Sequence, residues 1–240
     1  MTEFQNFLAQ GLKESGIDYS DDILVKCQKF YDLLLLWNQK INLTSLKDPK
    51  DIAVKHFVDS LICLKQVSFH QDDNLMDVGT GAGFPGVPIK IFLSGMKLTL
   101  LDSLEKRCRF LSNLVKTLEL KQVDIIHGRA EDKGRETSYR EQFSLVTARA
   151  VTALPILAEY CLPFLKVGGC FFALKGGEVH EEVEKGRKAI EIMGGEVAEI
   201  KYYRLPLLND ARSLVIVKKT CPTPGKYPRK AGIPSKKPIV

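Results

Sequence analysis

Apolar residues in the first part of the chain recur at the spacing of amphipathic helices. The first repeat is carried by Phe4, Phe7, Leu8 and Leu12. A second runs from Ile23 to Leu35, with Ser20 or Asp21 placed to cap it. Asp48 and Pro49 have the N-cap and first-turn character that opens a third helix. We therefore predict a helical cap over residues 1–70, too small to be an independent domain.

From Leu75 onward, short apolar runs alternate with helical patterns. We predict strands at 74–78, 97–101, 123–127, 143–148 and 169–174, and helices near 86–94, 104–118, 153–165 and 178–193. After Gly194, two further strands at 197–205 and 213–218 are predicted to form a terminal hairpin. Such alternation is typical of a mostly parallel sheet covered on both faces, here with seven strands and an antiparallel last pair. This α/β architecture over residues 71–220 is the class I S-adenosylmethionine-dependent methyltransferase fold, which differs from the all-parallel dinucleotide fold.

The segment 77–86, DVGTGAGFPG, joins the first predicted strand to a helix through alternating glycines. Its spacing also fits the dinucleotide fingerprint. However, Pro85 lacks an amide N–H and Asp77 adds negative charge, so the turn is poorly suited to bind a phosphate. A ligand with ammonium and sulfonium cations and no phosphate suits this turn, and S-adenosylmethionine is such a ligand. The predicted contacts are Asp77, Gly79, Gly81 and Gly83. The alternative is a tight turn whose glycines serve only packing.

Two acidic residues follow the next strands. Asp102 comes about 20 residues after the glycines, where an acid accepts hydrogen bonds from ribose hydroxyls. The alternative is a helix cap, a role that Ser103 can fill instead. Glu131 lies in the segment 128–132 after the third strand, placed to read an adenine. Together with the glycine turn, these acids predict a nucleoside pocket.

The end of the fourth strand restricts the atom that accepts the methyl group. It reads Ala148-Arg149-Ala150, without the Pro-Pro turn of exocyclic amino methylation or the Cys of pyrimidine carbon-5 methylation. Guanine N7 has a nucleophilic lone pair and loses no proton, so the enzyme need only align it. We therefore expect no general base and no catalytic side chain. Arg149 fits a positioning cation for phosphate, guanine O6 or the cofactor carboxylate, and a structural ion pair is its alternative role.

Composition narrows the classes of protein further. The chain has 240 residues, 45% hydrophobic and 27% charged, which is typical of a globular protein. The amino terminus lacks a basic leader, and the longest aliphatic run, Leu33 to Trp37, is too short to cross a bilayer. We therefore expect a cytoplasmic protein that does not associate with a membrane. Six dispersed cysteines and four dispersed histidines indicate neither disulfides nor a metal site. We predict reduced thiols in or near the core.

The carboxyl-terminal tail concentrates the positive charge. The chain carries +6 overall, and the acid-free stretch from residue 218 carries Lys218, Lys219, Lys226, Arg229, Lys230, Lys236 and Lys237. Its prolines predict an extended basic tail over residues 221–240, and Tyr227 offers a ring for stacking on a base. Such a tail favours RNA, and a solvated tail that aids solubility is the alternative. We expect it to contribute RNA affinity without cofactor affinity, unless Ile233 and Ile239 pack it onto the sheet.

Short segments spread over nearly the whole chain resemble the bacterial RsmG family, also called glucose-inhibited division protein B. They are residues 37–44 (WNQKINLT), 56–61 (HFVDSL), 77–86, 129–131, 148–150, 174–176 and 227–232 (YPRKAG). The resemblance implies transfer of methyl from S-adenosylmethionine to N7 of a guanine in the 530 loop of 16S rRNA. It also implies that 16S rRNA or the small ribosomal subunit is the partner, without an obligate protein partner.

The resemblance extends to individual residues. It implies cofactor roles for Gly79 and Phe84 in the loop, for Ala130 and Glu131 at the adenine, and for Arg149.

The same resemblance suggests residues that face RNA, namely Lys175 and, in the tail, Arg229 and Lys230. His56 and Asp59 lie one helical turn apart and are within reach of the acceptor pocket, although a structural His–Asp pair is an equal alternative. Three other functions remain open: a methyltransferase for another RNA, a protein or a small molecule, a nicotinamide-dependent dehydrogenase, and a non-catalytic RNA-binding module.

Overall fold

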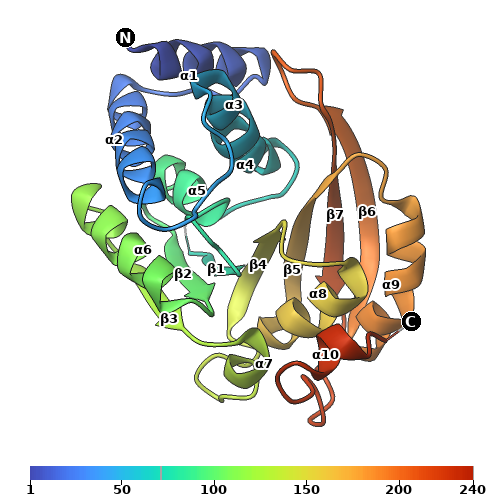
Figure 1. Ribbon diagram of the computed structural model, residues 1–240. Helices are drawn as coiled ribbons and strands as arrows, with labels where there is room; N and C mark the ends of the chain where they lie inside the picture. Colours follow the sequence, from blue (N-terminus) through green and yellow to red (C-terminus); the bar gives the residue numbers. More distant parts are fainter. Residues whose placement is uncertain (71, 240) are drawn as a thin grey trace.

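The protein is built around one seven-stranded sheet (Figure 1). The computed structural model describes residues 1–70 and 72–239. The strands are β1 (Asn74–Val78), β2 (Lys97–Asp102), β3 (Val123–His127), β4 (Phe143–Arg149), β5 (Leu165–Gly176), β6 (Gly195–Arg204) and β7 (Ala211–Lys219). Their order is β3-β2-β1-β4-β5-β7-β6, with β1 to β5 parallel and β7 antiparallel to both neighbours. The predicted class I methyltransferase fold is confirmed.

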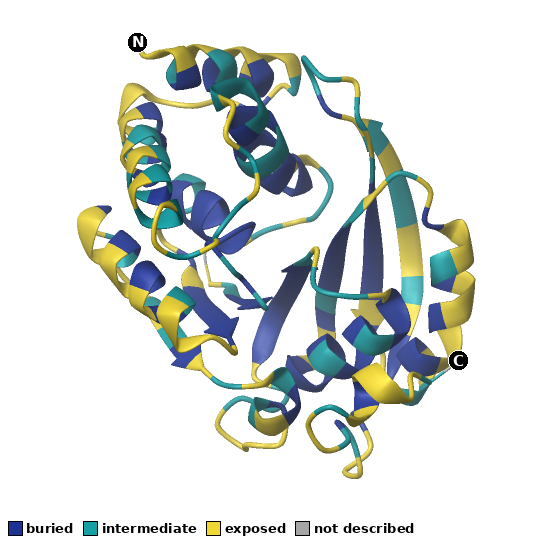
Figure 2. Ribbon diagram, in the orientation of Figure 1, coloured by how far each residue is buried: buried dark blue, intermediate teal, exposed yellow. Residues whose placement is uncertain are grey.

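Helices cover both faces of this sheet. They are α1 (Glu3–Glu14), α2 (Asp21–Asn38), α3 (Pro49–Ile52), α4 (Asp59–Ile62), α5 (Gly86–Phe92), α6 (Glu105–Thr117), α7 (Ala130–Lys133), α8 (Leu154–Cys161), α9 (His180–Ile192) and α10 (Ile233–Lys236). Strand residues alternate between two apolar clusters, so that Leu75 packs with α1, α2 and the helices after them, and Met76 packs with α8 and α9. The central strands are buried along their length (Figure 2). The helical cap therefore shares its core with one face of the sheet.

The capping residues act as the sequence predicts at two helices. Ser20 Oγ accepts from the Ile23 amide at the start of α2, and Asp48 Oδ1 accepts from the Asp51 amide at the start of α3, where Pro49 occupies the first turn. Beyond α3 the regular helix is interrupted. The segment Ala53–Val58 is a π-helix, and Cys63–Lys65 is a 3₁₀ turn after α4. π-Helical segments are frequent at functional sites.

Three local expectations were wrong. The tail is not extended: it turns back on the domain and forms α10, because Arg140 donates hydrogen bonds to the carbonyls of Thr223 and Tyr227, at 2.6 Å and 2.8 Å. Ser103 does not cap α6, since the residue before that helix is Leu104, whose amide donates to Asp102. Of the cysteines, Cys221 is exposed rather than in or near the core. In the described part of the chain, no helix is long and apolar enough to cross a membrane.

Candidate active site

The glycine turn after β1 adopts a backbone that side chains would prevent. Gly79, Gly81 and Gly83 have φ of +70°, +61° and +93°, in the left-handed region. A Cβ on Gly79 would lie 2.8 Å from Val151 Cγ2, and one on Gly83 would lie 2.8 Å from Val87 Cγ2. Gly79 therefore lets Val151 pack against the turn, and Gly83 in the same way lets Val87 of α5 pack closely.

Asp77 lies fully buried beneath this turn. Its Oδ2 accepts from Thr80 Oγ1 at 2.7 Å and from the Gly86 amide at 2.8 Å, which ties the end of β1 to the start of α5. Its Oδ1 has no hydrogen-bond partner among the described residues. Burial raises the pKa of Asp77 to about 6, so the carboxylate is charged at neutral pH. A buried anionic oxygen without a partner favours a cationic ligand at this turn over a phosphate.

A cavity of about 130 Å³ opens beside the turn, and we call it the nucleoside cavity. It is lined by Val78, Gly79, Leu101, Asp102, Ser103, Gly128, Arg129, Ala130, Glu131, Val151 and Tyr160. The turn and the two acids that the sequence assigns to a nucleoside thus meet at the carboxyl ends of β1, β2 and β3. Val151 and Tyr160 are lining residues that the sequence did not predict, because nothing in the local pattern distinguishes them from ordinary core positions.

The two acids of the nucleoside cavity also have structural partners. Asp102 Oδ2 accepts from the Gly81 amide and Oδ1 from the Leu104 amide, both at 2.9 Å, so one carboxylate shapes the glycine turn and starts α6. Glu131 Oε1 accepts from the amide of Gly232 in the tail at 2.8 Å. Both side chains are almost fully buried.

A second cavity of about 410 Å³ lies on the other side of the β4 end, and we call it the acceptor cavity. Its lining consists of Lys55, His56, Asp59, Arg149, Ala150, Leu174, Lys175, Gly176 and Arg212. Consecutive residues divide the two spaces, since Ala150 faces the acceptor cavity and Val151 the nucleoside cavity. Ala150 has φ +55°, a strained conformation for a residue with a Cβ and one that recurs at functional sites.

Arg149 joins the end of β4 to the π-helical segment. Its Nη1 donates to the carbonyls of Lys55 at 3.1 Å and His56 at 3.2 Å, and to Asp59 Oδ2 at 3.3 Å. Its guanidinium lies over the ring of Phe84, 5.2 Å from the centroid. Arg149 thus has the structural ion pair that was the alternative to its role as a cofactor ligand.

His56 is held as a neutral imidazole in the wall of the acceptor cavity. Its Nε2 lies 2.7 Å from Thr44 Oγ1, and its Nδ1 lies 3.4 Å from Arg149 Nη2. Because the guanidinium can only donate, we assign the proton to Nε2, which donates to Thr44. Burial and the charge of Arg149 lower the pKa of His56 to about 3. His56 therefore carries no charge at neutral pH.

Asp59 collects contacts from three elements. Its Oδ1 accepts from the Tyr203 hydroxyl at 3.0 Å, and its Oδ2 lies 3.3 Å from Arg149 and 3.7 Å from Arg212 Nε. Burial raises the pKa of Asp59, and the two arginines oppose this effect. Tyr203 and Arg212 come from the terminal hairpin, and no signal in the sequence links them to a residue more than 140 positions earlier.

The remaining predicted residues lie in different places. Phe84 is in the cap core, stacked between Phe30 at 4.8 Å and His56 at 4.7 Å between ring centroids. Lys175 lines the acceptor cavity and donates to Glu182 at 2.6 Å. In the tail, Arg229 is paired with a buried glutamate and Lys230 is exposed, so these two neighbours do not share a surface.

The family of the chain follows from its similarity to known proteins. A profile described as rRNA small subunit methyltransferase G, or GidB, matches residues 23–213. The chain belongs to this family. The resemblance to the RsmG family is thereby confirmed.

Relatives of the same name align along the full length of the chain. The protein named Ribosomal RNA small subunit methyltransferase G from Desulforamulus reducens is 48% identical over 239 residues, 100% of both chains. Its namesake from Acetivibrio thermocellus is 47% identical and covers 99% of this chain and 97% of its own.

Solved structures share the fold at low identity. A putative methyltransferase from Thermoplasma acidophilum has a TM-score of 0.50 and 15% identity over 63% of this chain and 70% of its own. TrmN from Thermus thermophilus has a TM-score of 0.51 and 12% identity over 68% of this chain and 48% of its own. At such identities the likeness shows the fold alone.

Proposed function

We propose that the protein transfers the methyl group of S-adenosylmethionine to N7 of a guanine in the 530 loop of 16S rRNA. Family membership supports a small-subunit rRNA substrate. The lining of the acceptor cavity supports N7 as the atom that accepts the methyl group. The described lining is rich in cations, and the two groups that could serve as a base, His56 and Asp59, are both hydrogen-bonded to other residues. A site of this kind suits an acceptor that loses no proton.

The nucleoside cavity is the proposed site for S-adenosylmethionine. Gly79 lines the cavity with bare backbone, and the Asp77 carboxylate favours the cationic end of the ligand. Asp102 is the proposed partner of the ribose hydroxyls, with Ala130 and Glu131 at the adenine. When bound, this cofactor supplies an electrophilic methyl group. The cavity volume of about 130 Å³ is below that of usual small-molecule pockets, so we propose that it holds the nucleoside end and that the methyl group faces the acceptor cavity.

The acceptor cavity is the proposed site for the guanosine. Four cations line it, Lys55, Arg149, Lys175 and Arg212, against the carboxylate of Asp59. Each of these cations is also paired with an acid. Their remaining N–H groups are the proposed donors to the base and phosphates of a nucleotide. Because the N7 lone pair attacks directly, the residues of the cavity need to orient the base and exclude water, and no proton has to be removed.

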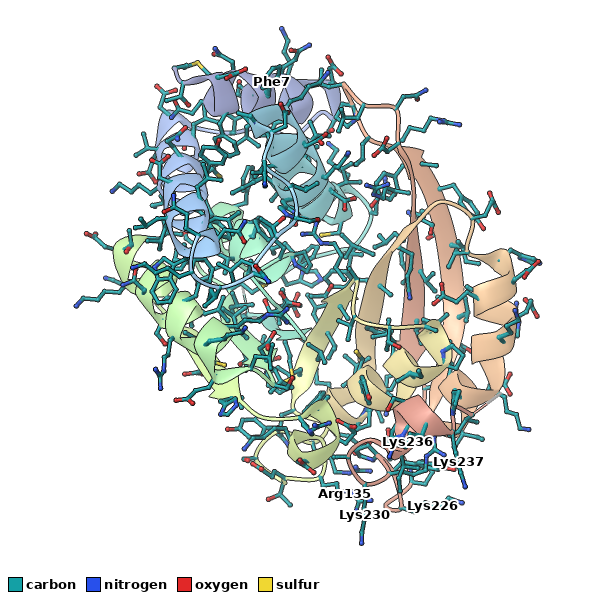
Figure 3. All side chains as sticks on the ribbon, viewed as in Figure 1. Phe7, Arg135, Lys226, Lys230, Lys236 and Lys237 are labelled. Atoms are coloured by element: carbon teal, nitrogen blue, oxygen red, sulfur yellow. The ribbon has the colours of Figure 1, made fainter. Side chains whose placement is uncertain are left out.

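A cationic end surface is the proposed contact for the RNA backbone. It consists of five exposed side chains, Arg135, Lys226, Lys230, Lys236 and Lys237, which gather at the end of the molecule where α10 lies (Figure 3). Exposed cations of this kind bind phosphates without reading sequence.

Mapping of the modified nucleotide tests the proposal. The purified protein is incubated with S-adenosylmethionine and small subunits from cells that lack its gene, and N7-methylguanine is located by reductive strand cleavage. Cleavage at one guanine of the 530 loop, absent with a Gly79→Asp variant, is the expected result. Methylation of a different atom, RNA or protein would contradict it. If the protein binds S-adenosylmethionine and RNA but methylates nothing in subunits, in naked 16S rRNA or in assembly intermediates, the non-catalytic RNA-binding function is favoured instead.

A further inference from the structure

The carboxyl-terminal segment, residues 222–239, folds back against the methyltransferase domain and reaches the nucleoside cavity. At its start, the Thr223 amide donates to Glu141 Oε1 at 2.7 Å, and Arg140 donates to the carbonyls of Thr223 and Tyr227. The segment then passes along α8, where Ile239 packs against the cluster of that face of the sheet. These contacts hold the segment in one path over α7 and α8.

A buried ion pair anchors the middle of the segment. Glu159 of α8 is 1% exposed, and Arg229 binds both of its carboxylate oxygens, with Nη2 to Oε2 at 2.7 Å and Nε to Oε1 at 3.0 Å. The backbone amide of Arg229 also donates to Oε1, at 2.6 Å. A carboxylate buried to this extent requires a partner, so the pair fixes the position of residue 229.

Three residues later, the segment contacts a wall of the cavity itself. The Gly232 amide donates to Glu131 Oε1 at 2.8 Å, and Glu131 is 3% exposed. Gly232 has φ +81°, a conformation that glycine adopts readily and that directs its amide toward α7. Tyr160, which also lines the cavity, has its pKa raised by burial and by the charge of Glu131. The segment therefore lies behind the part of the cavity assigned to the adenine.

We infer that Arg229 and Gly232 are positioning residues for the methyl donor: they hold Glu131 in the wall of the nucleoside cavity, so that the carboxyl-terminal segment completes the adenine end of the site. The inference rests on the proposed function, because it takes S-adenosylmethionine as the ligand of this cavity. It replaces the sequence-based expectation that the tail contributes no cofactor affinity, and it leaves the expected contribution to RNA affinity in place.

Two adjacent residues of the segment give a matched comparison. Arg229→Ala releases the anchor, whereas Lys230→Ala removes an exposed cation of the cationic end surface and leaves the anchor in place. Without the anchor, Glu131 is no longer held in place as a hydrogen-bond partner of the adenine. Loss of such a charged partner corresponds to about a tenfold to hundredfold change in affinity. By calorimetry, Arg229→Ala should weaken S-adenosylmethionine binding to this extent, and Lys230→Ala should leave it unchanged. Equal affinities in two folded variants and the wild type would overturn the inference.

A second readout separates positioning from general stability. S-adenosylhomocysteine and S-inosylhomocysteine differ at the exocyclic group of the base, so their affinity ratio reports on the adenine end. This ratio should fall toward one in Arg229→Ala, and an unchanged ratio would mean that the anchor serves folding alone.

If Arg229→Ala does not fold, hydrogen exchange in the wild-type protein provides the test. S-adenosylmethionine should slow exchange at the Gly232 amide and its neighbours, and unchanged exchange there at saturating ligand would contradict the inference. Wild-type protein that fails to bind S-adenosylmethionine at all would instead contradict the proposed function.

Discussion

Gly79 is the residue whose backbone and surroundings most restrict substitution in the site. It has φ +70°, and a Cβ there would lie 2.8 Å from Val151. A side chain at this position must therefore strain the turn and displace Val151, which lines the nucleoside cavity. The neighbouring Asp77 closes the turn with one carboxylate oxygen, and its other oxygen has no partner among the described residues.

We expect Gly79→Asp to abolish S-adenosylmethionine binding while the protein still folds, because the added carboxylate enters the cavity. Calorimetry measures the affinity, and circular dichroism with thermal melting measures the fold. Gly95→Ala is the matched control, since a Cβ there meets nothing within 4 Å. If a folded Gly79→Asp protein bound S-adenosylmethionine with wild-type affinity, the glycine turn would not be part of the binding site.

The pKa of His56 makes stability depend on pH in a defined direction. It lies near 3 in the folded protein and near 6.5 in the unfolded chain. Between these values the unfolded state binds more protons, so the free energy of unfolding decreases as the pH falls below about 6.5. His56→Gln removes this titration, and the stability difference between wild type and variant should shrink by at most about 1.4 kcal/mol per pH unit. Urea denaturation from pH 5 to pH 8 measures it, and a constant difference would show that His56 does not titrate in this way.

The proposed acceptor predicts a flat dependence of rate on pH. If guanine N7 is attacked, no group has to take a proton, and single-turnover rates should vary little between about pH 7 and 9. Below about pH 6, protonation of Asp77 should weaken cofactor binding, because its buried carboxylate loses the charge that favours a cation. A chemical step that rises with unit slope through a pKa between 7 and 9 would indicate another acceptor atom.

Among the secondary-structure elements, the π-helical segment connects the cap to the sheet. Its carbonyls at Lys55 and His56 receive the Arg149 guanidinium, and Asp59, just after it, completes the ion pair. The His56 carbonyl also accepts from the Asp59 amide and the Ser60 hydroxyl, so it joins its own segment to the guanidinium. These shared contacts fix the wall of the acceptor cavity.

Arg149→Ala distinguishes two roles for this side chain. It is 11% exposed and paired with Asp59, which keeps Tyr203 and Arg212 as partners. We therefore expect the free energy of unfolding to fall by about 1 to 3 kcal/mol, while S-adenosylmethionine affinity in the folded fraction changes little. Denaturant titration and calorimetry measure the two effects. Arg187→Ala, which removes a surface ion pair on α9, should leave the melting temperature unchanged. Lost cofactor affinity without lost stability would instead support the ligand role implied by the family resemblance.

Across the whole molecule, the cations fall into two groups, one in the acceptor cavity and one on the cationic end surface. The cations of the acceptor cavity are paired with acids. The cationic end surface is exposed (Figure 3), and four of its five cations lie on the carboxyl-terminal segment, whose Gly232 contacts Glu131. The inner side of this segment thus contacts the proposed cofactor site, and its outer side carries cations that are proposed to contact RNA.

Charge reversal on the outer side should weaken RNA binding in a salt-dependent way. Lys230→Glu, Lys236→Glu and Lys237→Glu together remove three cations that are proposed to bind phosphates, so the slope of log affinity against log salt should decrease by about 0.7 for each phosphate left unbound. Filter binding to 16S rRNA fragments at several salt concentrations measures the slope, and unchanged S-adenosylmethionine affinity is the control. An unaltered slope would mean that this surface aids solubility only.

Local patterns predicted the centre of the sheet well because β1, β2 and β4 are buried along almost their whole length. The observed β1 and β3 coincide with the predicted residues 74–78 and 123–127, and the other strands differ only at their ends. Continuous apolar runs bounded by glycine and charge leave few alternatives for such strands. The closeness of the glycine turn, Asp102 and Glu131 could also be predicted, since each lies at or just after the carboxyl end of a parallel strand and these ends meet at one edge of the sheet.

The contacts that complete the two cavities could not be predicted from local patterns. Arg229 and Glu159 are 70 positions apart, Gly232 and Glu131 are 101, and Tyr203 and Asp59 are 144. A proline-rich basic tail has the composition of a solvated segment, and no periodicity tells which of its cations will find a buried carboxylate. Such pairings depend on which side chains the packed helices bring within hydrogen-bond distance, where the cost of leaving a buried charge unpaired then selects the partner.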